Sequence, residues 1–236
     1  MAVYGGYYYY FDWTYILIIF AFLLSLIVQT SMQSTFRRYS RVASLCGLSG
    51  AEAARRILDS EGLYQVRVQP IRGSLTDHYD PRSKTVNLSE TVYGSRSLSA
   101  LGVAAHECGH AIQDAQEYVP LRVRSALVPA ANFGSQFSWI LFFIGLLFSS
   151  QILCQIGILL FCLALLFQLV TLPVEFNASH RALVKLGDMG LMNRSEVKNT
   201  RKVLRAAAMT YVAAVCTSLL YLLRMIILSG GGRRRD

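Results

Sequence analysis

Apolar residues gather in four long blocks along this chain, and polar residues fill the segments between them. The blocks cover residues 13–28, 132–148, 152–172 and 206–228. A helix needs about 20 mostly apolar residues to cross the hydrocarbon core of a bilayer, and the four blocks approach or exceed that length. The pattern therefore predicts a mainly α-helical integral membrane protein with four transmembrane helices.

The two middle blocks lie in a part of the chain that carries no charge. No Asp, Glu, Lys or Arg occurs between Arg124 and Glu175, and only the short segment SSQ separates the two blocks. We expect a tight transmembrane hairpin that returns the chain to the side from which it started. The last block contains Arg224. A hairpin or an interfacial helix is therefore the alternative there, although we favour a spanning helix.

The first block follows a run of tyrosines at residues 7–10, which is typical of an aromatic belt at the headgroup level. A cleaved signal peptide is the alternative, but the segment lacks a basic start and a small-residue cleavage site. Arg37, Arg38 and Arg41 follow the block, whereas no Lys or Arg precedes it. The positive-inside rule therefore places residues 36–131 in the cytoplasm.

The polar region after the first block has the signals of a small folded lobe. Ser49 and Glu52 form a capping box that opens a helix, and Gly62 can end it. Residues 64–71 and 84–89 alternate apolar and polar positions as half-buried strands do, and turn-forming residues join them. We expect a short two-stranded sheet, either a plain hairpin or one whose exposed edge pairs with an extended peptide.

These patterns divide the chain into five parts. They are an N-terminal transmembrane helix (1–35), a cytoplasmic region that contains the segment HECGH (36–131), a transmembrane hairpin (132–172), cytoplasmic helices (173–205), and a last transmembrane helix with a basic tail (206–236). Pro173 suits the first turn of a helix or a kink.

A helix capped by Ser97 or Ser99 carries the segment HECGH. His106 and His110 are four residues apart and share one helix face, so a ring nitrogen of each can reach one zinc ion. Glu107 lies one residue round the helix, where it can take a proton from a metal-activated water and pass it to the leaving amine. The alternative is a helix with two core histidines, but these are two of only four histidines in the chain.

A catalytic zinc ion needs three protein ligands and one open position. Glu175 is our candidate for the third ligand, because it follows the hairpin directly and emerges on the same side as His106. The alternative for Glu175 is an acid stabilised by a helix N-terminus, and His78 is then the next candidate ligand. Asp114 lies one turn beyond His110 and suits an outer or surface position.

The segments LTDHYDPRSKTVNLS, AAHECGHAIQ and LPVEFNASHRAL within an apolar chain resemble the neutral zinc metallopeptidases of bacterial membranes, the YugP type. The resemblance extends from the first apolar block to the last. It implies a gluzincin-like lobe on the bilayer and one zinc ion per chain, held by His106, His110 and Glu175. It also implies that Glu107 is the catalytic acid and base.

Membrane proteases of the wider gluzincin group commonly have an Asp four residues after the Glu ligand, where it braces a metal-binding His. In this chain Ser179 stands at that place. The resemblance therefore implies that another group supplies the bracing contact, and Asp77, Asp80 or a backbone carbonyl are the candidates.

Two histidines lie outside the HECGH segment. His78 stands in the loop between the predicted strands, where it suits a catalytic role in stabilising the oxyanion or binding substrate; a loop-stabilising hydrogen bond is the alternative. His180 follows Glu175 by five residues, about 140° round a helix, so we expect it to point away from the metal.

Composition indicates which classes of partner the chain can bind. The formal net charge is +9, but the basic residues flank apolar blocks and form no stripe with exposed aromatic residues, so we expect a lipid bilayer and no nucleic acid. The five cysteines form no CxxC pair, which favours reduced packing residues over a disulfide framework.

The sequence thus predicts a multi-pass membrane protein with its active site facing the cytoplasm, and the resemblance implies that the membrane is that of a bacterial cell. The expected function is that of a zinc-dependent endopeptidase acting on membrane or membrane-proximal proteins, with a protein or peptide as substrate. A regulatory membrane partner or a homo-oligomer is compatible with this prediction. The alternative is a catalytically weak membrane scaffold or adaptor that retains a structural zinc site.

Overall fold

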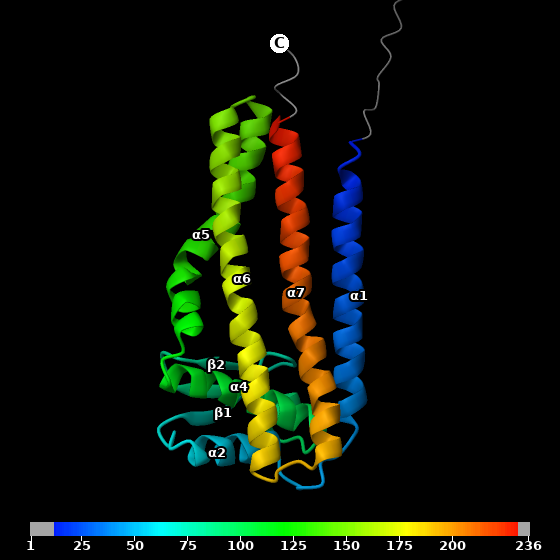
Figure 1. Cartoon of the computed structure of the whole chain (residues 1–236), viewed down its shortest axis with the longest axis vertical. Coiled ribbons are helices and arrows are strands. Elements are labelled where there is room, and N and C mark those ends of the chain that lie inside the picture. The colour runs from blue at the N-terminus through cyan, green and yellow to red at the C-terminus, as the bar shows by residue number, and fades with distance from the viewer. Residues whose placement is uncertain (1–11, 231–236) are drawn as a thin grey trace, which may run out of the picture.

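The computed structural model describes residues 12–230, and four long helices stand side by side in it with a small lobe at one end (Figure 1). The long helices are α1 (Tyr15–Ser40), α5 (Val119–Leu147), α6 (Gln151–Asp188) and α7 (Arg194–Gly230). The lobe contains α2 (Gly50–Ser60), α3 (Glu90–Tyr93), α4 (Leu98–Ala115), β1 (Arg67–Ile71), β2 (His78–Asp80) and β3 (Thr85–Ser89). All four long helices are long and apolar enough to cross a membrane, which confirms the predicted mainly helical fold with four candidate spans. The tyrosines at residues 7–10 lie outside the described residues.

The helices α5 and α6 form the predicted hairpin, and its turn lies at the end of the bundle opposite the lobe (Figure 1). A glycine allows their backbones to approach closely, because a Cβ at Gly157 would lie 2.8 Å from the carbonyl oxygen of Ser138. The helix α5 begins at Val119, well before the apolar block, and passes through Pro129. The first part of α5 therefore extends from the lobe towards the bundle.

The region 173–205 is not a separate pair of helices. α6 continues without interruption through Pro173 to Asp188, and α7 runs from Arg194 to Gly230 as one helix. A proline removes one backbone hydrogen bond, and several helical turns on each side of it keep α6 continuous. The change from apolar to charged residues therefore marks where the environment changes and not where the helix ends.

The sheet has three strands, so the prediction of a two-stranded sheet is wrong. The strand order is β1-β3-β2, with β1 parallel and β2 antiparallel to β3. β2 lies within the segment that the sequence assigns to a loop, because three residues are too few to show an alternating pattern between Asp and Pro turn formers. β3 is central, so residues 85–88 are not available as an exposed edge, and β1 and β2 are the two edge strands.

The lobe has its own hydrophobic core between α2, α4 and the sheet, which includes the fully buried Ile57, Val86 and Leu101. Ser49 and Glu52 form the predicted capping box at the start of α2. The same core includes Leu186 of α6 and Leu204 of α7, so burial of these apolar side chains stabilises the lobe together with the ends of the long helices.

The helix α4 lies against α6 and α7 and thereby joins the lobe to the bundle. Gly109 contacts α6 so closely that a Cβ there would lie 2.6 Å from the carbonyl oxygen of Ala178. Gly102 contacts α7 in the same way, because a Cβ there would lie 2.6 Å from Cγ2 of Thr200. Two glycines of α4 thus set its distance from the two helices that enter the lobe.

At the far end of the bundle, the buried Arg224 of α7 joins α7 to α1. Its guanidinium donates to Thr14 Oγ1 at 3.1 Å and pairs with Asp12 Oδ2 at 3.3 Å. Ionisable residues inside a membrane are usually paired in this way. The pairing explains how a charge is accommodated in the last apolar block.

Candidate metal centre

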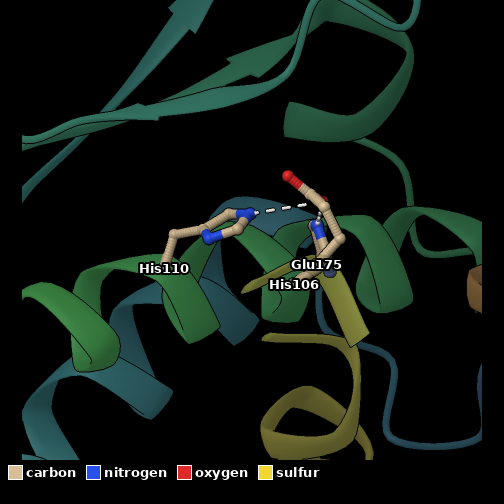
Figure 2. A group of neighbouring side chains, drawn as sticks. All are labelled: His106, His110 and Glu175. Atoms are coloured by element: carbon tan, nitrogen blue, oxygen red, sulfur yellow. Dashed lines mark hydrogen bonds and ion pairs between the residues drawn. The ribbon is translucent and has the colours of Figure 1, made fainter. Parts of the chain in front are cut away.

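The helix α4 presents two imidazoles on one face, as the spacing of His106 and His110 predicts (Figure 2). Ser97 is the residue that caps this helix, and its side chain accepts a hydrogen bond from the backbone N–H of Ala100 at 3.2 Å. The two rings lie edge to face with their centroids 4.7 Å apart. Their positions are therefore fixed by one well-capped helix.

Glu175 of α6 completes the group. Its Oε2 lies 3.2 Å from Nε2 of His106 and 3.6 Å from Nε2 of His110 (Figure 2). One ligand atom from each of the three residues lies within 4.8 Å of the others. Two imidazole nitrogens and one carboxylate oxygen are the donor set of many catalytic zinc sites, so these residues fit a zinc ion with one position left open.

Hydrogen bonds on the outer side of each imidazole hold Nε2 towards the centre of the group. Ser179 Oγ lies 3.1 Å from Nδ1 of His106. Ser179 is the residue four places after Glu175, where the resemblance implied that a different residue must supply the bracing contact. Asp77 and Asp80 have other contacts: Asp77 accepts hydrogen bonds from the backbone and side chain of Ser89, and Asp80 binds residues of its own turn. A serine therefore occupies the bracing position itself.

Gln113 supports the second imidazole, and the sequence reasoning missed it. Its Oε1 lies 3.0 Å from Nδ1 of His110, and its Nε2 donates to the carbonyl of Val174 and to Asn177 Oδ1. Gln113 thus links α4 to α6 beside Glu175. Its place three residues after His110 on the same helix was the signal that could have revealed it.

Glu107 is buried beside the two imidazoles. Burial raises the pKa of the Glu107 carboxyl, while the neighbouring His106 and His110 act in the opposite direction. Burial also raises the pKa of the nearby Asp77, which keeps its two hydrogen bonds from Ser89. A carboxyl with a raised pKa can accept and release a proton closer to neutral pH than an exposed glutamate can.

Two cavities of about 270 and 280 Å³ meet at this group. Both are lined by the same five residues: Asp77, His106, Glu107, Glu175 and Tyr211. One cavity extends towards α1, where Met32 lines it, and the other extends towards α5 and β2, where Val128 and Tyr79 line it. The group is therefore accessible from two sides.

Arg124 and Tyr211 belong to the site although the sequence reasoning did not select them. Arg124 of α5 pairs with the carboxylate of Glu175, with Nη1 at 3.5 Å from Oε1. Tyr211 of α7 lines both cavities. Arg124 is the last charged residue before the uncharged hairpin, which was a usable signal, whereas nothing in the sequence distinguishes Tyr211 from the other tyrosines.

The two remaining histidines differ in their surroundings. His78 is exposed on β2, its ring contacts the carbonyl of Thr76 and the side chain of Asn87, and it lines the cavity on the α5 side. His180 is exposed on α6 and lines a separate cavity with Arg194 and Arg201. Of these two histidines, His78 alone lines a cavity of the metal centre, and a role for it in binding substrate stays a prediction.

Asp114 has an outer position, as expected. It accepts a hydrogen bond from the hydroxyl of Tyr79 at 2.7 Å and pairs with Lys84. The carboxylate thus fastens the end of α4 to the edge strand β2 beside the cavities.

Comparison with known proteins identifies the family of this chain. Residues 14–230 match the family described as "Putative neutral zinc metallopeptidase", and the chain belongs to that family. The chain is also 49% identical to the "Putative membrane protease YugP" of Bacillus subtilis (strain 168) over 210 residues, which cover 89% of this chain and 93% of that protein. No solved structure matches the chain.

Proposed function

We propose that this protein is a membrane-embedded zinc endopeptidase whose metal is held by His106, His110 and Glu175. The family and the relative support a zinc metallopeptidase of a membrane. The observation that carries the proposal is the convergence of two imidazoles and a carboxylate from α4 and α6 next to the buried Glu107. The centre belongs to the gluzincin type, because the third ligand is a glutamate on a helix after the HECGH helix.

The chain's own residues divide the chemistry between them. When bound, zinc supplies Lewis-acid activation of a water molecule and of the scissile carbonyl. Glu107 takes a proton from the attacking water and delivers it to the nitrogen of the leaving amine. Ser179 and Gln113 keep the two imidazoles oriented while this happens.

The cavities favour a polypeptide substrate that passes across the site. Because the group is open towards both α1 and α5, a chain can extend beyond the scissile bond on both sides, as an endopeptidase requires. His78 on β2 lines one of these cavities and is our candidate for contacting the bound peptide or the oxyanion.

The substrates we propose are membrane or membrane-proximal proteins. Apolar side chains are exposed on the long helices next to the site, including Val128 on α5, Phe176 on α6 and Met209 on α7. Exposed apolar surface on helices of this length favours a site close to the bilayer. A peptide bond that lies close to the membrane surface is therefore within reach of the site.

We propose that the site faces the cytoplasm of a bacterial cell, because the last turn of α1, at the lobe end, carries Arg37 and Arg38 and is followed by Arg41. In a variant without native cysteines, Ser83→Cys should react only from the cytoplasmic side and Ser150→Cys only from outside. Reaction of both from one side would rule out this topology.

Proteolysis is tested with purified full-length protein in detergent or vesicles. The parent should cleave an unstructured protein substrate, and Glu107→Gln should keep zinc and lose about 10²–10⁴-fold in rate, since a positioned acid-base group contributes that much. Glu117→Gln is the matched control, because Glu117 is exposed and, among residues 12–230, its one ion pair is with Arg122. Equal rates for the parent and Glu107→Gln would refute the mechanism. Zinc binding without cleavage of any substrate would favour the scaffold alternative.

A further inference from the structure

Arg124 and Glu175 are the charged residues on either side of the uncharged hairpin in the sequence, and their side chains contact each other in the structure. The 3.5 Å ion pair joins Arg124 Nη1 on α5 to Oε1 of Glu175 on α6, at the lobe end of the two helices. The side chain of Glu175 is only 4% exposed, and that of Arg124 is 30% exposed. The guanidinium therefore contacts a buried carboxylate, through the oxygen that does not face the imidazoles.

The two oxygens of Glu175 have different partners. Oε2 faces Nε2 of His106 and His110, whereas Oε1 faces the guanidinium of Arg124. A carboxylate that has no such partner can turn about its last side-chain bond and offer both oxygens to a cation. An arginine partner on one oxygen opposes that rotation, because the guanidinium charge attracts Oε1 at 3.5 Å and the turn would bring this oxygen to the imidazoles instead.

We infer that Arg124 is a positioning residue of the metal centre, which holds Oε1 of Glu175 so that Oε2 alone is presented to the ion. This inference rests on the proposed zinc site. Its chemical consequence is that one metal position stays free of protein ligands, as a hydrolytic zinc site requires. The ion pair also connects the first turns of α5 to the site. Both helices of the hairpin therefore contribute a residue to the metal centre, Arg124 from α5 and Glu175 from α6.

Substrate binding is the alternative role for Arg124, and the experiment below distinguishes it from positioning of Glu175. Arg124 lines the cavity that contains His78 and Tyr79, where a guanidinium could bind the carboxylate of a peptide C-terminus. In that case its removal would raise KM for peptides with a free C-terminus and leave the metal centre unchanged.

The experiment compares Arg124→Gln and Arg124→Lys with the parent, using full-length protein purified in detergent. Zinc affinity is measured by competition with a chromophoric chelator, and the cobalt-substituted protein reports coordination number through its visible absorption. Arg122→Gln is the matched control, because Arg122 lies on the same helix, is exposed and pairs with Glu117 and not with Glu175 in the described part of the chain.

We expect Arg124→Gln to weaken zinc binding by about 10–100-fold, the effect usual for partners of metal ligands. The cobalt absorption should weaken as the freed carboxylate offers its second oxygen and the coordination number rises. Arg124→Lys should show a smaller loss, because the ammonium keeps the charge without the planar fork. Arg122→Gln should match the parent in both measurements.

Unchanged zinc affinity and an unchanged cobalt spectrum in Arg124→Gln would overturn the inference, and a rise in KM alone would overturn it in favour of substrate binding. If Arg124→Gln does not fold, as judged by circular dichroism and gel filtration, Arg124→Lys decides by the same two measurements. A parent protein that binds no zinc would instead refute the proposed function, so the two failures are distinguishable.

Discussion

Buried charges meet at both ends of the helical bundle, but the two groups differ in how they are enclosed. At the far end, Arg224 finds Thr14 and Asp12 as partners and closes the contact between α7 and α1. At the lobe end, Glu175, His106 and His110 also contact one another, yet they line two cavities. A charge pair between two helices holds them together, whereas a cluster of charged side chains that borders a cavity is accessible to a substrate.

The largest expected effect is at the lobe end. The double variant His106→Ala and His110→Ala should lose stoichiometric zinc, because it removes two of three protein ligands. Metal analysis of the purified protein measures this. Arg224→Met should retain zinc fully, and full zinc in the double histidine variant would mean that the metal binds elsewhere.

Removal of Glu175 tests the contribution of α6. Glu175→Ala should weaken zinc binding by more than the about 10–100-fold typical of residues that only support ligands. Glu175→Asp should also be damaging, because the carboxylate loses one methylene of reach from a packed helix. Chelator competition gives both values, and parent-like affinity in Glu175→Ala would make His78 the leading candidate for the third ligand.

Substitution of Ser179, which contacts His106, should have a smaller effect on zinc binding than loss of a ligand. Ser179→Ala should weaken zinc binding by about 10-fold, since it removes the contact to Nδ1 of His106 but leaves every ligand in place. Ser179→Asp should restore or exceed parent affinity, because a carboxylate accepts the imidazole N–H more strongly than a hydroxyl does. A variant Ser179→Ala with unchanged affinity would show that the contact does not support the metal.

The far end should respond in the opposite way. Arg224→Met should lower the unfolding midpoint in detergent by a few degrees and leave zinc affinity and cleavage rate unchanged, because its partners hold α1 against α7 away from the cavities. Thermal unfolding with and without a chelator measures this. A loss of zinc binding in this variant would remove the distinction between the two ends.

The parts of the site that the sequence could predict are those set by local periodicity. The spacing of His106 and His110 fixes a shared helix face, and the uncharged hairpin brings Glu175 back to the same side. The long helices were predictable for the same reason, since an apolar block of membrane length has few alternatives.

The parts that could not be predicted depend on contacts between distant segments. β2 is three residues long and exists because β3 offers it a partner, so its own sequence carries no periodic signal. Tyr211 enters the site through the packing of α7 against α6. Ser179 stands at the expected position, but only the structure shows that a hydroxyl occupies it beside His106.

The uninterrupted course of α6 has a mechanical consequence. From Gln151 to Glu175 a helix rises about 36 Å at roughly 1.5 Å per residue, slightly more than the hydrocarbon thickness of about 30 Å. Because α6 continues as one helix through Pro173 to Glu175, a tilt that the bilayer imposes on α6 moves this carboxylate relative to α4. The lipid thickness around the protein thus becomes a variable that can tune the geometry of its metal centre.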